Sequence, residues 1–98
     1  MTIPAIEAEI LRITQARGLS GSVCPTEIAR AIDPGPGEHW RTRLSAVRRA
    51  AIRLAQAGRI DILRKGRGVD PAQEIRGVIR LRIRPNTDDN SPQTGNLP

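Results

Sequence analysis

Hydrophobic residues in the first part of the chain recur with helical spacing. Ile3, Ile6, Ile10 and Ile13 follow one another at intervals of three and four residues, which predicts a helix over 3–17. Gly18 follows it, and glycine is the residue most favoured just after a helix.

A second helix is predicted over 25–32, with Ile28, Ala29 and Ile32 on its buried face. Pro25 suits a first helical position and makes Cys24 the N-cap by count. Glu27 could then reach back to the free backbone N–H of the cap. Since cysteine is a poor cap residue, Thr26 stays open as an alternative cap. The sequence DPGPG at 33–37 must end the helix.

A long third helix is predicted over 38–57. Its core face is formed by Trp40, Leu44, Val47, Ala51 and Leu54, all of which fall on one side at 100° per residue. The opposite side is centred on short polar residues and arginines, and Gly58 ends the helix.

The hydrophobic period then changes from helical spacing to alternation. Residues 59–64 and 75–84 are predicted strands, and in the second one Ile79, Leu81 and Ile83 should point inward. The loop 65–75 between them makes a long-looped antiparallel hairpin. Asp61 and Arg82 are expected to pair across its exposed face.

This order of elements predicts an α+β fold, the winged helix. Helices 25–32 and 38–57 would form the helix-turn-helix pair, helix 38–57 would be the recognition helix, and residues 65–75 would be the wing. The domain would span 1–84. Residues 85–98 are nearly free of apolar side chains and are expected to form a disordered tail.

The segments SVCPTEIARAI, WRTRLSAVRRAAIRLAQAGRIDI, GVDP and RGVIRLRI resemble a family of small bacterial proteins classed as a domain of unknown function. The resemblance covers about residues 6–84. It implies a winged-helix-like fold and supplies no catalytic or binding residue.

Composition narrows the function classes. The chain of 98 residues has one cysteine, so it forms no internal disulfide, and it has no apolar run as long as a membrane span. Acidic residues stand near the N-terminus where a signal peptide would be basic. We therefore expect a cytoplasmic protein. The formal net charge is +6, which suits a polyanionic partner, although an arginine-rich composition is also typical of a GC-rich genome.

The placement of the cations favours nucleic acid. Helix 38–57 has no acidic residue after Glu38, and a basic cluster stands where the wing begins. Double-stranded DNA is the predicted partner. The candidate contact residues are Arg41, Thr42, Ser45, Arg48, Arg49, Arg64, Lys65 and Arg67. Ile52 on the same side of the helix, and Asp70 and Glu74 in the wing, weigh against this prediction.

Other functions remain open. The same fold can serve as a protein-interaction module, so a protein partner is the alternative. Cys24 and His39 are the only cysteine and histidine, which makes a thiol enzyme a weak third hypothesis. We expect no enzymatic activity, no cofactor and no metal site. Trp40, the only aromatic residue, is expected in the core against the first helix and the hairpin, with base stacking as the minority reading.

Overall fold

The helices form where the spacing of apolar residues predicts them. The structure is a computed structural model that describes residues 2–73, 75 and 77–85. Its elements are α1 (Ile3–Arg17), α2 (Pro25–Ile32), the 3₁₀-helix η1 (His39–Arg43), α3 (Leu44–Gln56), β1 (Ile60–Arg64), β2 (Arg67–Gly68) and β3 (Arg80–Ile83). The predicted tail, apart from Pro85, lies outside the described residues.

The ends of α1 and α2 follow ordinary capping chemistry. The Thr2 hydroxyl accepts a hydrogen bond from the Ala5 N–H at the start of α1. Cys24 is the N-cap of α2, as predicted, and the Glu27 carboxylate accepts a hydrogen bond from the Cys24 N–H at 3.1 Å. Both helices are therefore fixed at the residue where they begin.

The predicted helix 38–57 is two elements rather than one. Its first turn is η1, whose tighter winding is typical of a helix terminus, and α3 begins only at Leu44. The Thr42 hydroxyl donates to the His39 carbonyl at 2.7 Å within this turn. The tighter turn carries Trp40 toward α2. The sequence predicts Trp40 against the first helix and the hairpin, but η1, the element that carries Trp40, packs mainly on α2 and α3.

The sheet has three strands, and this corrects the predicted two-stranded hairpin. The strand order is β2-β1-β3, and both pairings are antiparallel. Lys65 and Gly66 have φ of 54° and 80°, which is the geometry of a two-residue type I′ turn. This turn brings Arg67 opposite Arg64, so part of the predicted loop 65–75 is strand β2.

The β1–β3 pairing has the predicted inward face. Ile79 and Leu81 are buried and Ile83 is half-buried. Asp61 stands opposite Arg82, and the guanidinium donates to the carboxylate at 3.2 Å, which confirms the predicted pair. Val23 adds a single bridge on the other side of β3 through two hydrogen bonds with Leu81.

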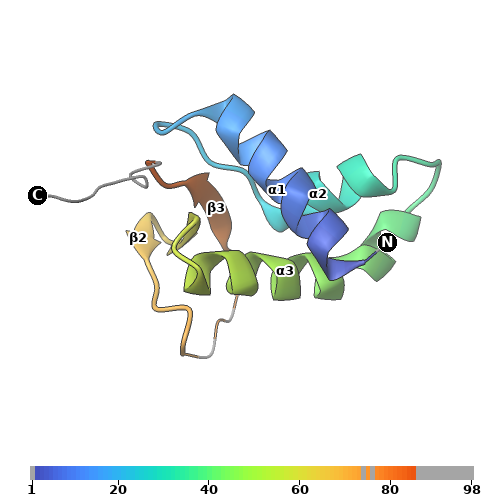
Figure 1. Cartoon of the computed structure of the whole chain (residues 1–98). Helices are drawn as coiled ribbons and strands as arrows, with labels where there is room; N and C mark the ends of the chain where they lie inside the picture. Colours follow the sequence, from blue (N-terminus) through green and yellow to red (C-terminus); the bar gives the residue numbers. More distant parts are fainter. Residues whose placement is uncertain (1, 74, 76, 86–98) are drawn as a thin grey trace, which may run out of the picture.

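The core lies between the three helices and one face of the sheet. Its largest fully buried side chains include Ile6, Ile10, Ile28, Val47, Ile60 and Leu81. In Figure 1, α1 and α2 lie on one side of α3, and the chain after β2 swings out past α3 before it returns to β3. This α+β arrangement is consistent with the winged-helix type.

Candidate nucleic-acid interface

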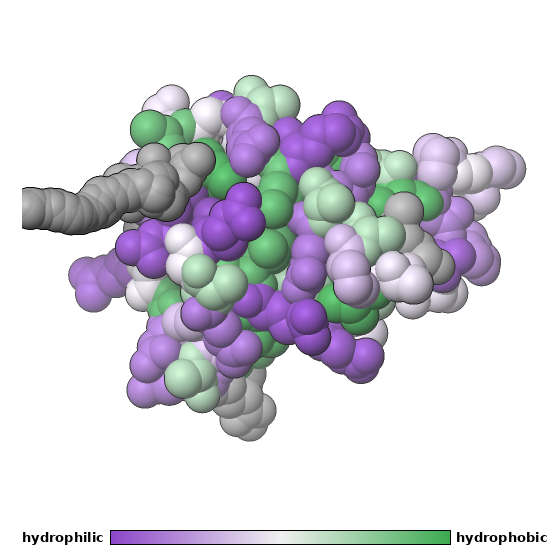
Figure 2. Space-filling model, viewed as in Figure 1, coloured by the Kyte–Doolittle hydropathy of each residue, from purple (hydrophilic) through white to green (hydrophobic). Residues whose placement is uncertain are grey.

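The exposed side of α3 is polar, as the sequence pattern predicts. Ser45, Arg49, Arg53 and Gln56 are exposed along it. Among the described residues the exposed large hydrophobic side chains are Leu19 and Val78, and neither belongs to α3. In Figure 2 hydrophilic residues cover much of one face of the molecule, and hydrophobic colour appears in a central band and in smaller patches on either side of it.

The arginines of η1 pair with acids of the preceding turn. Arg41 donates to Glu38 at 3.0 Å and also lies over the Trp40 ring, 4.8 Å from its centroid. Arg43 and His39 both contact the Asp33 carboxylate, at 3.1 and 2.6 Å. The hydrogen bond from His39, assisted by Arg43, lowers the pKa of Asp33 below its ordinary value. Arg41 is thus held on the protein, although the sequence places it on the predicted contact face.

Arg48 is also engaged. Its guanidinium donates to the backbone carbonyls of Ile75 at 3.2 Å and Gly77 at 3.3 Å. Two turns along the same side of α3, the Gln56 side chain reaches the Pro71 carbonyl at 3.5 Å. Ile52, between them, is half-buried against the core. The segment after β2 therefore covers one flank of α3, and Ile52 is not part of an open groove-facing surface.

Arg53, on the other flank of α3, pairs with Glu7 of α1 at 2.8 Å. No acid follows Glu38 in the helix, yet the fold supplies one from another element. Of the candidate residues in α3, Ser45 and Arg49 are exposed, and within the described residues no hydrogen bond or ion pair engages the Arg49 side chain.

The tip of the β1–β2 hairpin carries the other candidate cations. Arg64, Lys65 and Arg67 are all exposed, and Arg64 and Arg67 face each other across the two strands. The Arg64 guanidinium also lies beside Gly77, where it would meet an added Cβ at 3.4 Å. Asp70, whose negative charge weighs against DNA contact at the wing, accepts a hydrogen bond from the Ala72 N–H at 2.9 Å and so shapes the backbone there.

The ion pairs sort the cations into two groups. Apart from Asp70, every carboxylate of the described residues forms an ion pair: Glu7, Glu9, Glu27, Asp33, Glu38 and Asp61. The cations outside these pairs, in the part of the chain that the structure describes, are Arg30, Arg48, Arg49, Arg59, Arg64, Lys65 and Arg67. All but Arg30 fall between positions 48 and 67. Surplus positive charge is therefore concentrated on α3, the turn after it and the hairpin.

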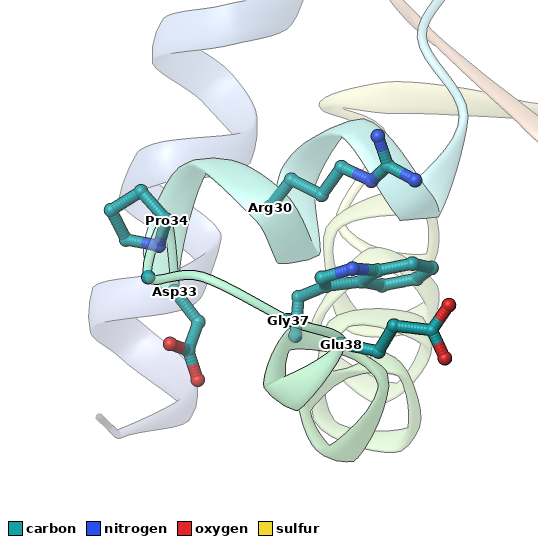
Figure 3. A pocket seen from close by; sticks show the side chains of 7 residues that line it. Arg30, Asp33, Pro34, Gly37 and Glu38 are labelled. Atoms are coloured by element: carbon teal, nitrogen blue, oxygen red, sulfur yellow. The ribbon is translucent and has the colours of Figure 1, made fainter.

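A pocket of about 400 Å³ lies at the turn between α2 and η1. Its lining includes Arg30, Asp33 and Glu38, and Figure 3 shows the Arg30 and Glu38 side chains extending in one direction and the Asp33 side chain in another. The Arg30 guanidinium lies 4.6 Å from the centroid of the Trp40 ring, which is 8% exposed. The prediction that Trp40 belongs to the core is confirmed. Arg30 and Arg41 lie over its indole ring, so the ring is not open to a stacking base.

Candidate chemistry outside this interface is sparse. Cys24 is half-buried at the start of α2, and the His39 ring is engaged by Asp33. Over residues 2–73, 75 and 77–85 there is no group of three His, Cys, Asp or Glu side chains that could hold a metal ion. In the same residues no helix has the length and apolar character needed to cross a membrane.

A comparison with curated proteins found no match. A family model described as "Protein of unknown function (DUF3253)" matches residues 4–84, which is nearly the whole described structure. The chain therefore belongs to this family of proteins of unknown function.

Proposed function

We propose that this protein binds double-stranded DNA through α3 and the hairpin that follows it. The observation that carries the proposal is that, among the described residues, the cations outside ion pairs are concentrated between Arg48 and Arg67. DNA presents a dense row of phosphates, and neutralising them releases counterions, so such a surface gains affinity for any duplex.

A protein-interaction module is the alternative, and the surface of α3 argues against it. Docking faces have a core rich in aromatic and large apolar side chains. The exposed residues of α3 are polar or charged instead, including Ser45, Arg49 and Gln56.

The proposal is tested by titrating a labelled random-sequence duplex with the full chain at two salt concentrations. The logarithm of affinity should fall with the logarithm of salt, with a slope of about −0.9 for each phosphate contacted. For about three to six contacts, a roughly fourfold rise in salt should weaken binding about 40-fold to 2,000-fold. Absence of binding to any duplex at low salt would remove the proposal and leave the interaction module.

Charge-reversal variants separate a specific surface from general attraction. Arg49→Glu should weaken binding more than Arg12→Glu, although both change the net charge equally. Arg12 is a suitable control because it is exposed on α1 and its ion pair, with Glu9, lies within the same helix. Arg17 is less suitable, since it bonds Glu27 and the Ser22 carbonyl and so ties α1 to α2. Equal losses for Arg49→Glu and Arg12→Glu would indicate diffuse attraction to a basic protein.

A further inference from the structure

The free surface of α3 is narrower than that of a helix that enters the major groove. The groove is about 12 Å wide, and a helix with its side chains has a diameter of about 10–12 Å. On α3, Arg48 and Gln56 hold the segment after β2 against one flank. A helix with a second chain segment attached along its side exceeds the width of the groove.

The side chains available on α3 are also few. A recognition helix contacts base edges with three or four side chains, mostly near its N-terminal end. Here the N-terminal cations Arg41 and Arg43 are paired with Glu38 and Asp33. Arg49 is the exposed arginine that remains, and a single arginine suits a phosphate contact better than base readout.

The β1–β2 hairpin has the properties that α3 lacks. A two-stranded ribbon also fits the major groove, and its strands lie about 4.8 Å apart. Every residue of its tip, from Arg64 to Gly68, is exposed. A Cβ added at Gly66 or Gly68 would meet no atom within 4 Å, so the tip projects into open space.

The hairpin is held in place before any ligand arrives. At its base, Ile62 and Leu63 are buried, and the Val69 N–H donates to the Ile62 carbonyl at 2.9 Å. The tight turn fixes the two strands against each other, so binding would cost little conformational entropy.

The tip also carries a charge arrangement that is unfavourable for the isolated protein. Arg64 and Arg67 are directly opposite, and like charges at such positions destabilise a sheet. Lys65 adds a third cation and adopts a positive φ, which costs energy for a residue other than glycine. A polyanion at the tip would remove this repulsion.

We therefore infer that the hairpin tip, residues 64–68, enters the major groove and that Arg67 reads guanine, while Arg49 of α3 contacts the phosphate backbone. This inference rests on the proposed DNA binding, and it assigns the base contact to the hairpin and the phosphate contact to α3. A guanidinium pairs with the N7 and O6 acceptors of guanine through two parallel hydrogen bonds. Because the Arg64 guanidinium lies beside Gly77, Arg67 is the better placed of the two opposed arginines.

The test starts by selecting preferred duplexes from a random pool with the full chain, then measuring affinities of variants for the selected duplex and for an unrelated one. Arg67→Ala should weaken binding to the selected duplex about tenfold or more and should abolish the preference. Arg67→Lys keeps the charge and should still lose the preference, because an ammonium cannot form the paired bonds. Arg49→Ala, the matched control, should weaken binding to the selected duplex and to the unrelated duplex by the same factor.

Base analogues locate the contact. Replacing the selected guanines by 7-deazaguanine removes the N7 acceptor in the major groove. This replacement should weaken duplex binding by the wild type and leave duplex binding by Arg67→Ala unchanged. Replacing them by inosine removes only the minor-groove amino group and should have little effect on either. Thermal melts of Arg67→Ala should match the wild type or lie slightly above it, since the side chain is exposed and its removal relieves the repulsion from Arg64.

Two results would overturn the assignment. Loss of sequence preference with Arg49→Ala, but not with Arg67→Ala, would make α3 the reading element and leave DNA binding intact. Sensitivity to inosine alone would place the tip in the minor groove. A wild type that binds no duplex at low salt would instead remove the proposed function itself.

Discussion

At the scale of single residues, Trp40 is the largest apolar side chain that the protein can bury. The chain has no Phe or Tyr that could share this role. It is 8% exposed and lies in the hydrophobic cluster, with Arg30 and Arg41 over its ring. Guanidinium groups over an indole attract its π-face, so Trp40 joins the apolar core to the polar turn between α2 and η1.

Trp40→Ala should destabilise the fold by about 3–5 kcal/mol, because it deletes a large buried side chain. A domain this small lies toward the lower end of the usual range of unfolding free energies, which is about 5–15 kcal/mol. The variant should therefore be largely unfolded at room temperature, as measured by far-ultraviolet circular dichroism. Trp40→Phe keeps an aromatic ring and should retain a cooperative melt at a lower temperature. A near wild-type melt for Trp40→Ala would contradict the core role.

Asp33 gives a prediction with pH. His39 first and Arg43 second lower the pKa of its carboxyl in the folded protein. A lowered folded-state pKa means that the charged group adds stability above its unfolded pKa, and that this contribution is lost as the pH falls through the folded value. Asp33→Asn should therefore be less stable than the wild type at neutral pH, and the two should converge in acid.

Denaturant midpoints measured from about pH 7 to about pH 2 would follow this convergence. Asp70→Asn is the control, because Asp70 forms no ion pair with the described residues. If the difference in denaturant midpoint between the wild type and Asp33→Asn stays constant as the pH falls to about 2, the stabilising role of the Asp33 carboxylate would be contradicted.

At the scale of elements, the hydrophobic pattern does not predict the turn between β1 and β2. The clean alternation of Ile79, Leu81 and Ile83 predicts β3, and helical spacing predicts α1, α2 and α3. The strand β2 is too short to show a period. Its signal was Lys65-Gly66, but lysine is uncommon at a position with positive φ, and Asn or Asp there would have indicated the turn.

Substitutions of the hairpin glycines test the turn. Gly66 has φ of 80°, and Gly68 lies outside the positive-φ region, while neither has an atom near the place of an added Cβ. Gly66→Ala should therefore lower stability by about 1–2 kcal/mol, through backbone strain alone. Gly68→Ala should be close to neutral. Equal melting temperatures for the two variants would argue against the two-residue turn.

Arg48 tests the attachment of the segment after β2. Arg48→Ala removes two hydrogen bonds from a guanidinium to backbone carbonyls, at Ile75 and Gly77. Hydrogen exchange should accelerate at the amides of residues 69–70, 72–73, 75 and 77–79, while α1 and α2 keep their protection. Arg49→Ala, one position further along, should leave exchange in this segment unchanged. Faster exchange across the entire protein would point to a general loss of stability instead.

At the scale of the whole molecule, the sequence predicts the fold class but not the sorting of charge. The α+β class follows from the order of periodic segments, and the core follows from their apolar faces. Ion pairs such as Arg53 with Glu7 join residues far apart in the chain, and no local pattern indicates them. Which arginines remain outside ion pairs is therefore a property of the tertiary structure. It narrows the candidate interface from helix 38–57 together with the wing to Arg49 and the β1–β2 hairpin.

The surface formed by the cations outside ion pairs also predicts how DNA changes the stability of the whole molecule. A ligand that binds the folded state raises its stability by mass action, by about 1.4 kcal/mol at ten times the dissociation constant. For a domain of this size that gain corresponds to roughly 5–10 °C in melting temperature. Duplex DNA at low salt should therefore raise the melting temperature of the wild type, followed by the fluorescence of Trp40, the only tryptophan. Arg67→Glu should reduce this rise and Arg12→Glu should keep it, because only the first removes a cation from the surface that lies outside the ion pairs. The same rise in both variants would mean that the whole basic protein, and not this surface, attracts the duplex.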